Sequence, residues 1–207
     1  MKKLREPVSY RFREKASVFL TELHPAPDVA TRAAALSAVR KRDHDATHHC
    51  SAWREGIPVI AFGSDDDGEP SGTAGPPMLK VLEGQEITDV IAICVRWYGG
   101  TKLGTGGLVR AYTEGVMGAV AEAERLGQFE QARILIEGLI EVPPEMAHLP
   151  FAVLGCFKNA EILRQDFDAA VSRIFFRLPP EDRLDFELAW RERSRGGTVS
   201  WERVSGL

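Results

Sequence analysis

The chain has 207 residues, 44% hydrophobic and 27% charged, a balance typical of globular proteins and enough for one large or two small domains. Its 26 Lys and Arg against 30 Asp and Glu give a net charge of −4. This excludes binding to nucleic acid by bulk positive charge and leaves only a local basic patch. No stretch approaches the roughly 18 apolar residues of a membrane span, and no apolar core follows the basic start as in a secretory signal.

The three cysteines, Cys50, Cys94 and Cys156, are widely spaced and form no CxxC pair. Such usage is typical of free thiols in a reducing compartment, and it favours neither a disulfide framework nor a zinc site. We therefore expect a cytoplasmic protein that does not act at a membrane.

The first half of the chain, residues 1–128, predicts a mixed domain that begins with a hairpin of alternating residues, 8–12 and 16–23. Asp28 is a suitable cap for a helix that runs to about residue 42. The pattern then predicts two strands (47–54 and 59–62), a short helix (78–82), a buried strand (90–97) and a long helix (about 107–126). The helical pattern ends at Gly127, where we place the domain boundary.

The second half, residues 129–207, predicts the order βαββαβ of a ferredoxin-like domain. The expected elements are strands at 133–142, 160–165, 170–177 and 198–204, with helices at 145–157 and from Pro179 to Gly196. We predict a turn at 166–168 and an apolar stripe on the last helix of Leu184, Leu188 and Trp190. This order does not by itself indicate an activity.

An acidic loop, residues 63–77, carries the first informative motif, GSDDDGEPSGTAGPP. One interpretation is a metal loop, because hard cations prefer carboxylate oxygens, but the residues do not fit the calcium-loop template. The favoured interpretation is structural. In it, Ser71 and Thr73 cap a helix, and Asp66, Asp67 and Glu69 hold the turn through bonds to the backbone.

A glycine-rich loop, RWYGGTKLGTGGLVR at residues 96–110, follows the buried strand and opens the long helix. Backbone amides at a helix start form a ready anion site, on which Arg96, Lys102 and Arg110 are expected to converge. The Walker pattern fails at Leu103, and the dinucleotide pattern fails at Val109. The alternative is that these glycines only permit tight packing.

The run His48-His49-Cys50 invites a metal or a thiol-catalysis interpretation. On a strand, His48 and Cys50 share one face while His49 points away. No further metal ligand stands at suitable spacing, and no neighbouring base is evident for a nucleophilic thiol. The sequence therefore indicates no catalytic residue, no metal and no cofactor.

Three stretches resemble the IMPACT family in its bacterial YigZ branch. They are DDGEPSGTAG at 66–75, RWYGGTKLGTGGLVRAY at 96–112, and DATHHC at 45–50 with the AWR that follows. The sequence departs from the family pattern at His49, where Asn is more usual, and at Pro76, where Lys is more usual. The absent lysine weakens a phosphate-binding version of this surface.

The resemblance implies an α+β protein of two domains, 1–128 of IMPACT type and 129–207 ferredoxin-like. Its first domain would be similar to the second domain of the fifth small-subunit ribosomal protein and to domain IV of elongation factor G, and both of these domains contact RNA on the ribosome. Eukaryotic members are translation regulators. Carried onto this chain, it implies a nucleic-acid or anion surface of Arg96, Tyr98, Gly99, Gly100, Lys102, Gly104, Thr105 and Arg110, an acidic loop of Asp66, Asp67, Glu69, Ser71 and Thr73, and a weaker addition in His48.

The first hypothesis is therefore a translation regulator that binds RNA or the ribosome through the glycine loop, and we expect it to be a monomer. The second is an enzyme acting on a small phosphorylated substrate, with Asp67 and Glu69 as metal ligands or general base. The third is a protein-interaction module in which Lys102 and Arg110 only neutralise the acidic loop. An enzyme is less favoured because no catalytic constellation is recognised.

Overall fold

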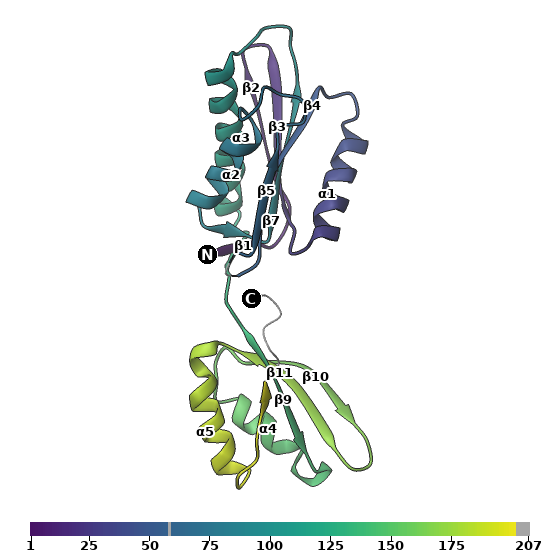
Figure 1. Cartoon of the computed structure of the whole chain (residues 1–207), viewed down its shortest axis with the longest axis vertical. Coiled ribbons are helices and arrows are strands. Elements are labelled where there is room, and N and C mark those ends of the chain that lie inside the picture. The colour runs from purple at the N-terminus through teal and green to yellow at the C-terminus, as the bar shows by residue number, and fades with distance from the viewer. Residues whose placement is uncertain (58, 202–207) are drawn as a thin grey trace. The chain divides into compact units, whose positions relative to one another are not determined.

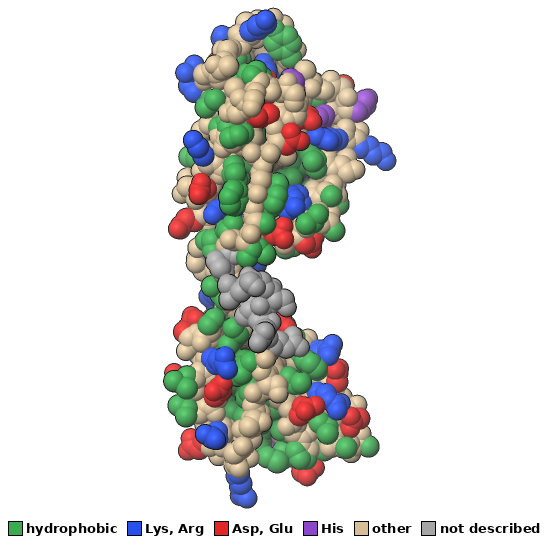
Figure 2. Space-filling model, in the orientation of Figure 1, with side chains coloured by type: hydrophobic (Ala, Val, Ile, Leu, Met, Phe, Trp, Pro, Cys, Tyr) green, Lys and Arg blue, Asp and Glu red, His purple; other side chains and the backbone are tan. Residues whose placement is uncertain are grey.

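The structure, a computed structural model, describes residues 1–57 and 59–201, and the chain divides into two compact units, Met1–Ala132 and Arg133–Leu207 (Figure 1). The boundary expected at residue 128 falls before this division, because residues 129–131 pair as a strand within the first unit. Figure 2 shows acidic and basic side chains interspersed over the face in view, consistent with the near-neutral composition. Within the described residues, no helix has the length and apolar character needed to cross a membrane.

An antiparallel five-stranded sheet in the order β2-β3-β7-β4-β5 forms the centre of the first unit. Its central strand β7 is a continuous apolar run, as expected of a strand covered on both faces. Its strands are β2 (Val8–Glu14), β3 (Ser17–Pro25), β4 (His48–Glu55), β5 (Ala61–Asp65) and β7 (Val90–Trp97).

Helices cover both faces of this sheet (Figure 1). Alternate residues of β7 explain this: Ile91, Ile93 and Val95 pack with α1, while Ala92 and Cys94 belong to the core beneath α2 and α3. The helices are α1 (Val29–Arg42), α2 (Gly75–Gly84) and α3 (Thr105–Arg125). As predicted, the Asp28 side chain caps α1, accepting from the amide of Thr31 at 2.7 Å.

A second, small sheet closes one end of the first unit in the order β6-β1-β8. Its strands are β1 (Lys2–Leu4), β6 (Ile87–Thr88) and β8 (Phe129–Gln131). None was predicted, because strands of two or three residues carry too little periodicity to be detected. The pairing of β1 with β8 ties the two ends of this unit together.

The second unit has the predicted βαββαβ order and an antiparallel sheet in the order β10-β11-β9-β12. This strand order defines a ferredoxin-like domain. Its strands are β9 (Ile136–Val142), β10 (Glu161–Phe167), β11 (Ser172–Leu178) and β12 (Ser200–Trp201), and its helices are α4 (His148–Leu154) and α5 (Arg183–Arg193), each preceded by a 3-10 turn, η1 (Pro144–Met146) and η2 (Pro180–Asp182).

Two predictions for this unit are wrong. The predicted apolar stripe is wrong for Leu184 and Leu188, which are exposed, whereas its third member, Trp190, is buried together with Phe186, because this larger aromatic pair at i, i+4 fills the space over the sheet. The turn predicted at 166–168 lies later, because Asp168 accepts from the amides of 170 and 171. Residues 202–204 of the last predicted strand lie outside the described residues.

Candidate functional site

The glycine loop connects β7 to α3 and is shaped by glycines with different tasks. A Cβ on Gly99 would lie 1.8 Å from the carbonyl oxygen of Ala16, so the loop packs directly on the turn between β2 and β3. Gly104, at the cap position of α3, has φ +73° and offers no side chain to the helix amides, which leaves the start of α3 open. Gly100 also has positive φ, and a Cβ added there would have no atom of the surrounding structure within 4 Å.

The acidic loop is held mainly by Asp66. Its carboxylate accepts from the amides of Gly72, Ala74 and Gly75 at 2.7, 2.9 and 2.8 Å. Partial burial raises the pKa of this carboxyl, but the three amide donors outweigh it and lower the pKa below its ordinary value. Asp66, rather than Ser71 or Thr73, therefore caps α2. Thr73 instead donates its hydroxyl to the carbonyl of Pro70 within the loop.

Asp67 fastens the same loop to α1 and β4. Its carboxylate pairs with Arg40 at 2.6 Å and accepts from the amide of His49 at 2.7 Å. The His48 Nδ1 atom lies 2.9 Å from the carbonyl oxygen of Asp67. The partner of Asp67 is thus Arg40, not Lys102 or Arg110 as one hypothesis held.

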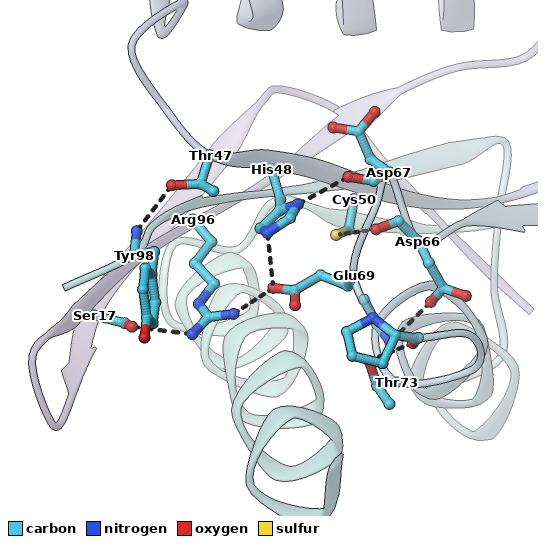
Figure 3. A network of polar contacts seen from close by, with 12 residues as sticks. Ser17, Thr47, His48, Cys50, Asp66, Asp67, Glu69, Thr73, Arg96 and Tyr98 are labelled. Carbon is cyan, nitrogen blue, oxygen red and sulfur yellow. Dashed lines mark hydrogen bonds and ion pairs between the residues drawn. The ribbon is translucent and has the colours of Figure 1, made fainter. Parts of the chain in front are cut away.

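Glu69 enters a buried polar network beneath the loop (Figure 3). Its Oε1 atom accepts from Arg96 at 2.6 Å and from the hydroxyl of Tyr112 at 2.7 Å, and His48 Nε2 lies 3.8 Å from it. Arg96 also donates to the Ser17 hydroxyl at 3.1 Å. The Glu69 and Arg96 side chains are only 3% and 5% exposed, so Arg96 is a structural counter-ion whose charge is already balanced.

Cys50 lies on the same face of β4 as His48, as predicted, while His49 turns away, its Nε2 atom 3.1 Å from the Asp43 carbonyl oxygen. The Cys50 sulfur is 3.0 Å from the carbonyl oxygen of Asp66 and 3.3 Å from the Tyr112 hydroxyl. Burial raises the pKa of this thiol well above its ordinary range. A thiol held neutral in this way is not an activated nucleophile.

These elements enclose a pocket of about 450 Å³ between the two loops. Its lining combines apolar surface, one lysine, the start of α3 and the edge of the buried network. The lining residues are Thr47, His48, Gly68, Glu69, Pro70, Arg96, Tyr98, Lys102, Leu103, Gly104, Thr105 and Leu108.

The structure therefore brings together seven of the residues singled out from the sequence: His48, Glu69, Arg96, Tyr98, Lys102, Gly104 and Thr105. The others, Asp66, Asp67, Ser71, Thr73, Gly99, Gly100 and Arg110, do not line this pocket. Sequence reasoning missed Tyr112, although its spacing of four from Leu108 places both on one helix face. Across residues 1–57 and 59–201, no three His, Cys, Asp or Glu side chains are grouped to hold a metal ion.

Fold and site together define a two-domain α+β protein whose first domain carries a pocket lined by the two loops. The Impact N-terminal domain family matches residues 15–120, a span that contains both loops. The chain therefore belongs to the IMPACT family.

Individual relatives support this membership. The chain is 45% identical over 118 residues to the IMPACT family member YigZ of Escherichia coli (strain K12), over 56% of this chain and 58% of the relative. It is 37% identical to an IMPACT family member of Haemophilus influenzae over 77% of this chain and 76% of the relative. A crystal structure described as that of a hypothetical protein is 32% identical and covers 100% of this chain and 98% of its own, with a TM-score of 0.71.

Proposed function

We propose that this protein is an RNA-binding translation regulator that contacts RNA, free or on the ribosome, through the pocket between its acidic and glycine loops. The observation that carries the proposal is the joint presence, in one pocket, of an uncapped helix start, Lys102 and the exposed ring of Tyr98. Helix amides and a lysine bind phosphate, and an aromatic ring stacks on an unpaired base. Translation regulation by eukaryotic family members supports the same assignment.

The ion pairs near the pocket indicate which basic side chain is left to attract an RNA phosphate. Arg96 is neutralised by Glu69, and Arg110 does not line the pocket. Lys102 is therefore the lysine expected to meet a phosphate, with Lys15 close by, since its Nζ atom lies 3.4 Å from the Lys102 carbonyl oxygen. Binding through one or two lysines needs no broad basic surface, so it agrees with a net charge of −4.

The test is sedimentation with ribosomes, together with binding to total RNA, over a salt series. Lys102→Ala should weaken RNA binding and lower the slope of log affinity against log salt by about one, as expected for one lost phosphate contact. Lys80→Ala is the matched control, because Lys80 lies on α2 in a different surface hollow. No binding by the parent protein, or an unchanged slope in Lys102→Ala, would contradict the proposal.

A further inference from the structure

We propose that the pocket holds a single ribonucleotide, with its phosphate at the start of α3, a ribose hydroxyl on Glu69 and its base against Tyr98. This inference rests on the proposed function and specifies the ligand unit. It treats the pocket as a subsite for one unstacked nucleotide rather than as part of a surface for duplex RNA.

The phosphate end is the junction of the glycine loop and α3. The amide of Leu108 bonds to the Gly104 carbonyl oxygen, whereas no side chain caps the helix start. Lys102 supplies a cation to the same end of the pocket lining. A second observation points to a ligand: the Glu69 carboxylate lines the same pocket, and its contacts with the described residues involve only one of its two oxygens.

The ribose end is the free oxygen of Glu69. All three neighbours of this carboxylate, Arg96, Tyr112 and His48, are on Oε1. Its Oε2 atom has no hydrogen-bond partner among the described residues, and Figure 3 draws no contact to it. Since Glu69 lines the pocket, this oxygen is an acceptor for a ligand hydroxyl. A fixed carboxylate is the group that recognises ribose hydroxyls in nucleotide sites, and the 2′-hydroxyl distinguishes RNA from DNA.

The base end is the ring of Tyr98, which is 43% exposed. The backbone amide of Tyr98 donates to the Thr47 hydroxyl at 3.1 Å, and the Arg96 guanidinium lies 5.4 Å from its ring centroid, so the ring has a fixed backbone and one supported face. Leu103, Leu108 and Pro70 add apolar surface to the lining. A lining of mainly apolar groups with a few polar ones suits a planar base.

The volume of the pocket favours a single nucleotide. About 450 Å³ lies in the lower part of the range for small-ligand pockets, roughly 300 to 1,000 Å³. A base must leave its helical stack to reach such a pocket, which favours a single-stranded loop or an end.

The experiment titrates the protein with AMP and UMP, their 2′-deoxy counterparts and inorganic phosphate, using calorimetry and backbone NMR shifts. We expect the ribonucleotides to bind about tenfold more tightly than the deoxyribonucleotides, as for one lost hydrogen bond to a charged acceptor. Inorganic phosphate should bind more weakly than either. The shifts should centre on residues 98–108.

A variant pair tests the base contact. Tyr98→Ala should weaken AMP binding by about tenfold or more, the usual loss for one stacked base, whereas Tyr98→Phe keeps the ring and should bind as the parent does. Binding of short 5′-phosphorylated single-stranded RNA, compared with its 5′-hydroxyl form, separates a terminal nucleotide from a free one as the source.

The inference is overturned if AMP, deoxy-AMP and phosphate bind equally, or if no nucleotide binds while RNA still binds with a slope that depends on Lys102. Either result leaves the proposed function standing. If instead nucleotides bind as expected but RNA and ribosomes do not, the RNA-binding function fails and the pocket is a site for free nucleotides.

Discussion

The carboxylate of Glu69 and the guanidinium of Arg96 meet at 2.6 Å, and the two side chains are 3% and 5% exposed. They link the acidic loop to β7, and both residues line the pocket. Removing one partner leaves the other charge buried, so Glu69→Ala or Arg96→Met alone should lower the free energy of unfolding by about 3 to 5 kcal/mol. Denaturant titrations followed by circular dichroism measure this.

Two controls define that measurement. The double variant Glu69→Leu/Arg96→Met should be less destabilised than either single variant, because apolar side chains need no counter-charge. Arg177→Ala breaks an exposed pair with Glu161 and should cost about 1 kcal/mol or less. Equal losses in the buried and exposed pairs would contradict the structural role of Glu69.

Asp66 should make the free energy of unfolding depend on pH at low pH. Its folded-state pKa is lowered from the ordinary value of 3.8, so the folded state binds this proton less readily than the unfolded state. The stabilisation is therefore complete above about pH 4 and is lost as pH falls through the lowered pKa. Asp66→Asn keeps one acceptor oxygen for the helix amides but loses the charge and the bond from Gly72, so it should lose about 1 to 2 kcal/mol at pH 7.

The difference in unfolding free energy between the parent and Asp66→Asn should then shrink between pH 4 and pH 2. Asp45→Asn is a suitable control, since Asp45 precedes β4 and is exposed. A difference that stays constant down to pH 2 would mean that the amide cap contributes nothing through its charge.

The thiols should react according to burial. Cys50 and Cys94 are fully buried, and burial raises the pKa of both, that of Cys94 to about 12, whereas Cys156 is exposed. A thiol reagent at pH 8 should therefore label one cysteine rapidly in the folded protein and all three after unfolding. Cys156→Ser should abolish the rapid phase, and rapid labelling of that variant would show an accessible Cys50.

Substitution by alanine should have opposite effects on stability at Gly99 and at Gly84. Gly99→Ala places Cβ 1.8 Å from the Ala16 carbonyl oxygen, so the glycine loop must move, with a loss of about 1 to 3 kcal/mol and weaker RNA binding. Gly84, at the end of α2, has open space, and Gly84→Ala should be neutral or stabilise by up to about 1 kcal/mol. A parent-like Gly99→Ala protein would show that the close approach is not needed.

Much of the fold followed from local patterns. The alternating hairpin, the cap at Asp28 and the apolar run of β7 depend on neighbours along the chain, so they were predictable. The predicted stripe on α5 failed at Leu184 and Leu188, although Trp190 is buried as predicted. Two apolar faces of this helix were available, and only packing against the sheet favoured the face of Phe186 and Trp190.

The sequence by itself determined the elements, the βαββαβ order and the two loops with chemically suitable residues, because period and turn chemistry act over a few residues. Only the tertiary structure decided which charges meet. Glu69 and Arg96 stand 27 residues apart, and Tyr112 is 43 residues from Glu69, so no local spacing relates them. The same long-range packing neutralised Arg96, left Arg110 outside the pocket, and left Lys102 as the lysine that lines it.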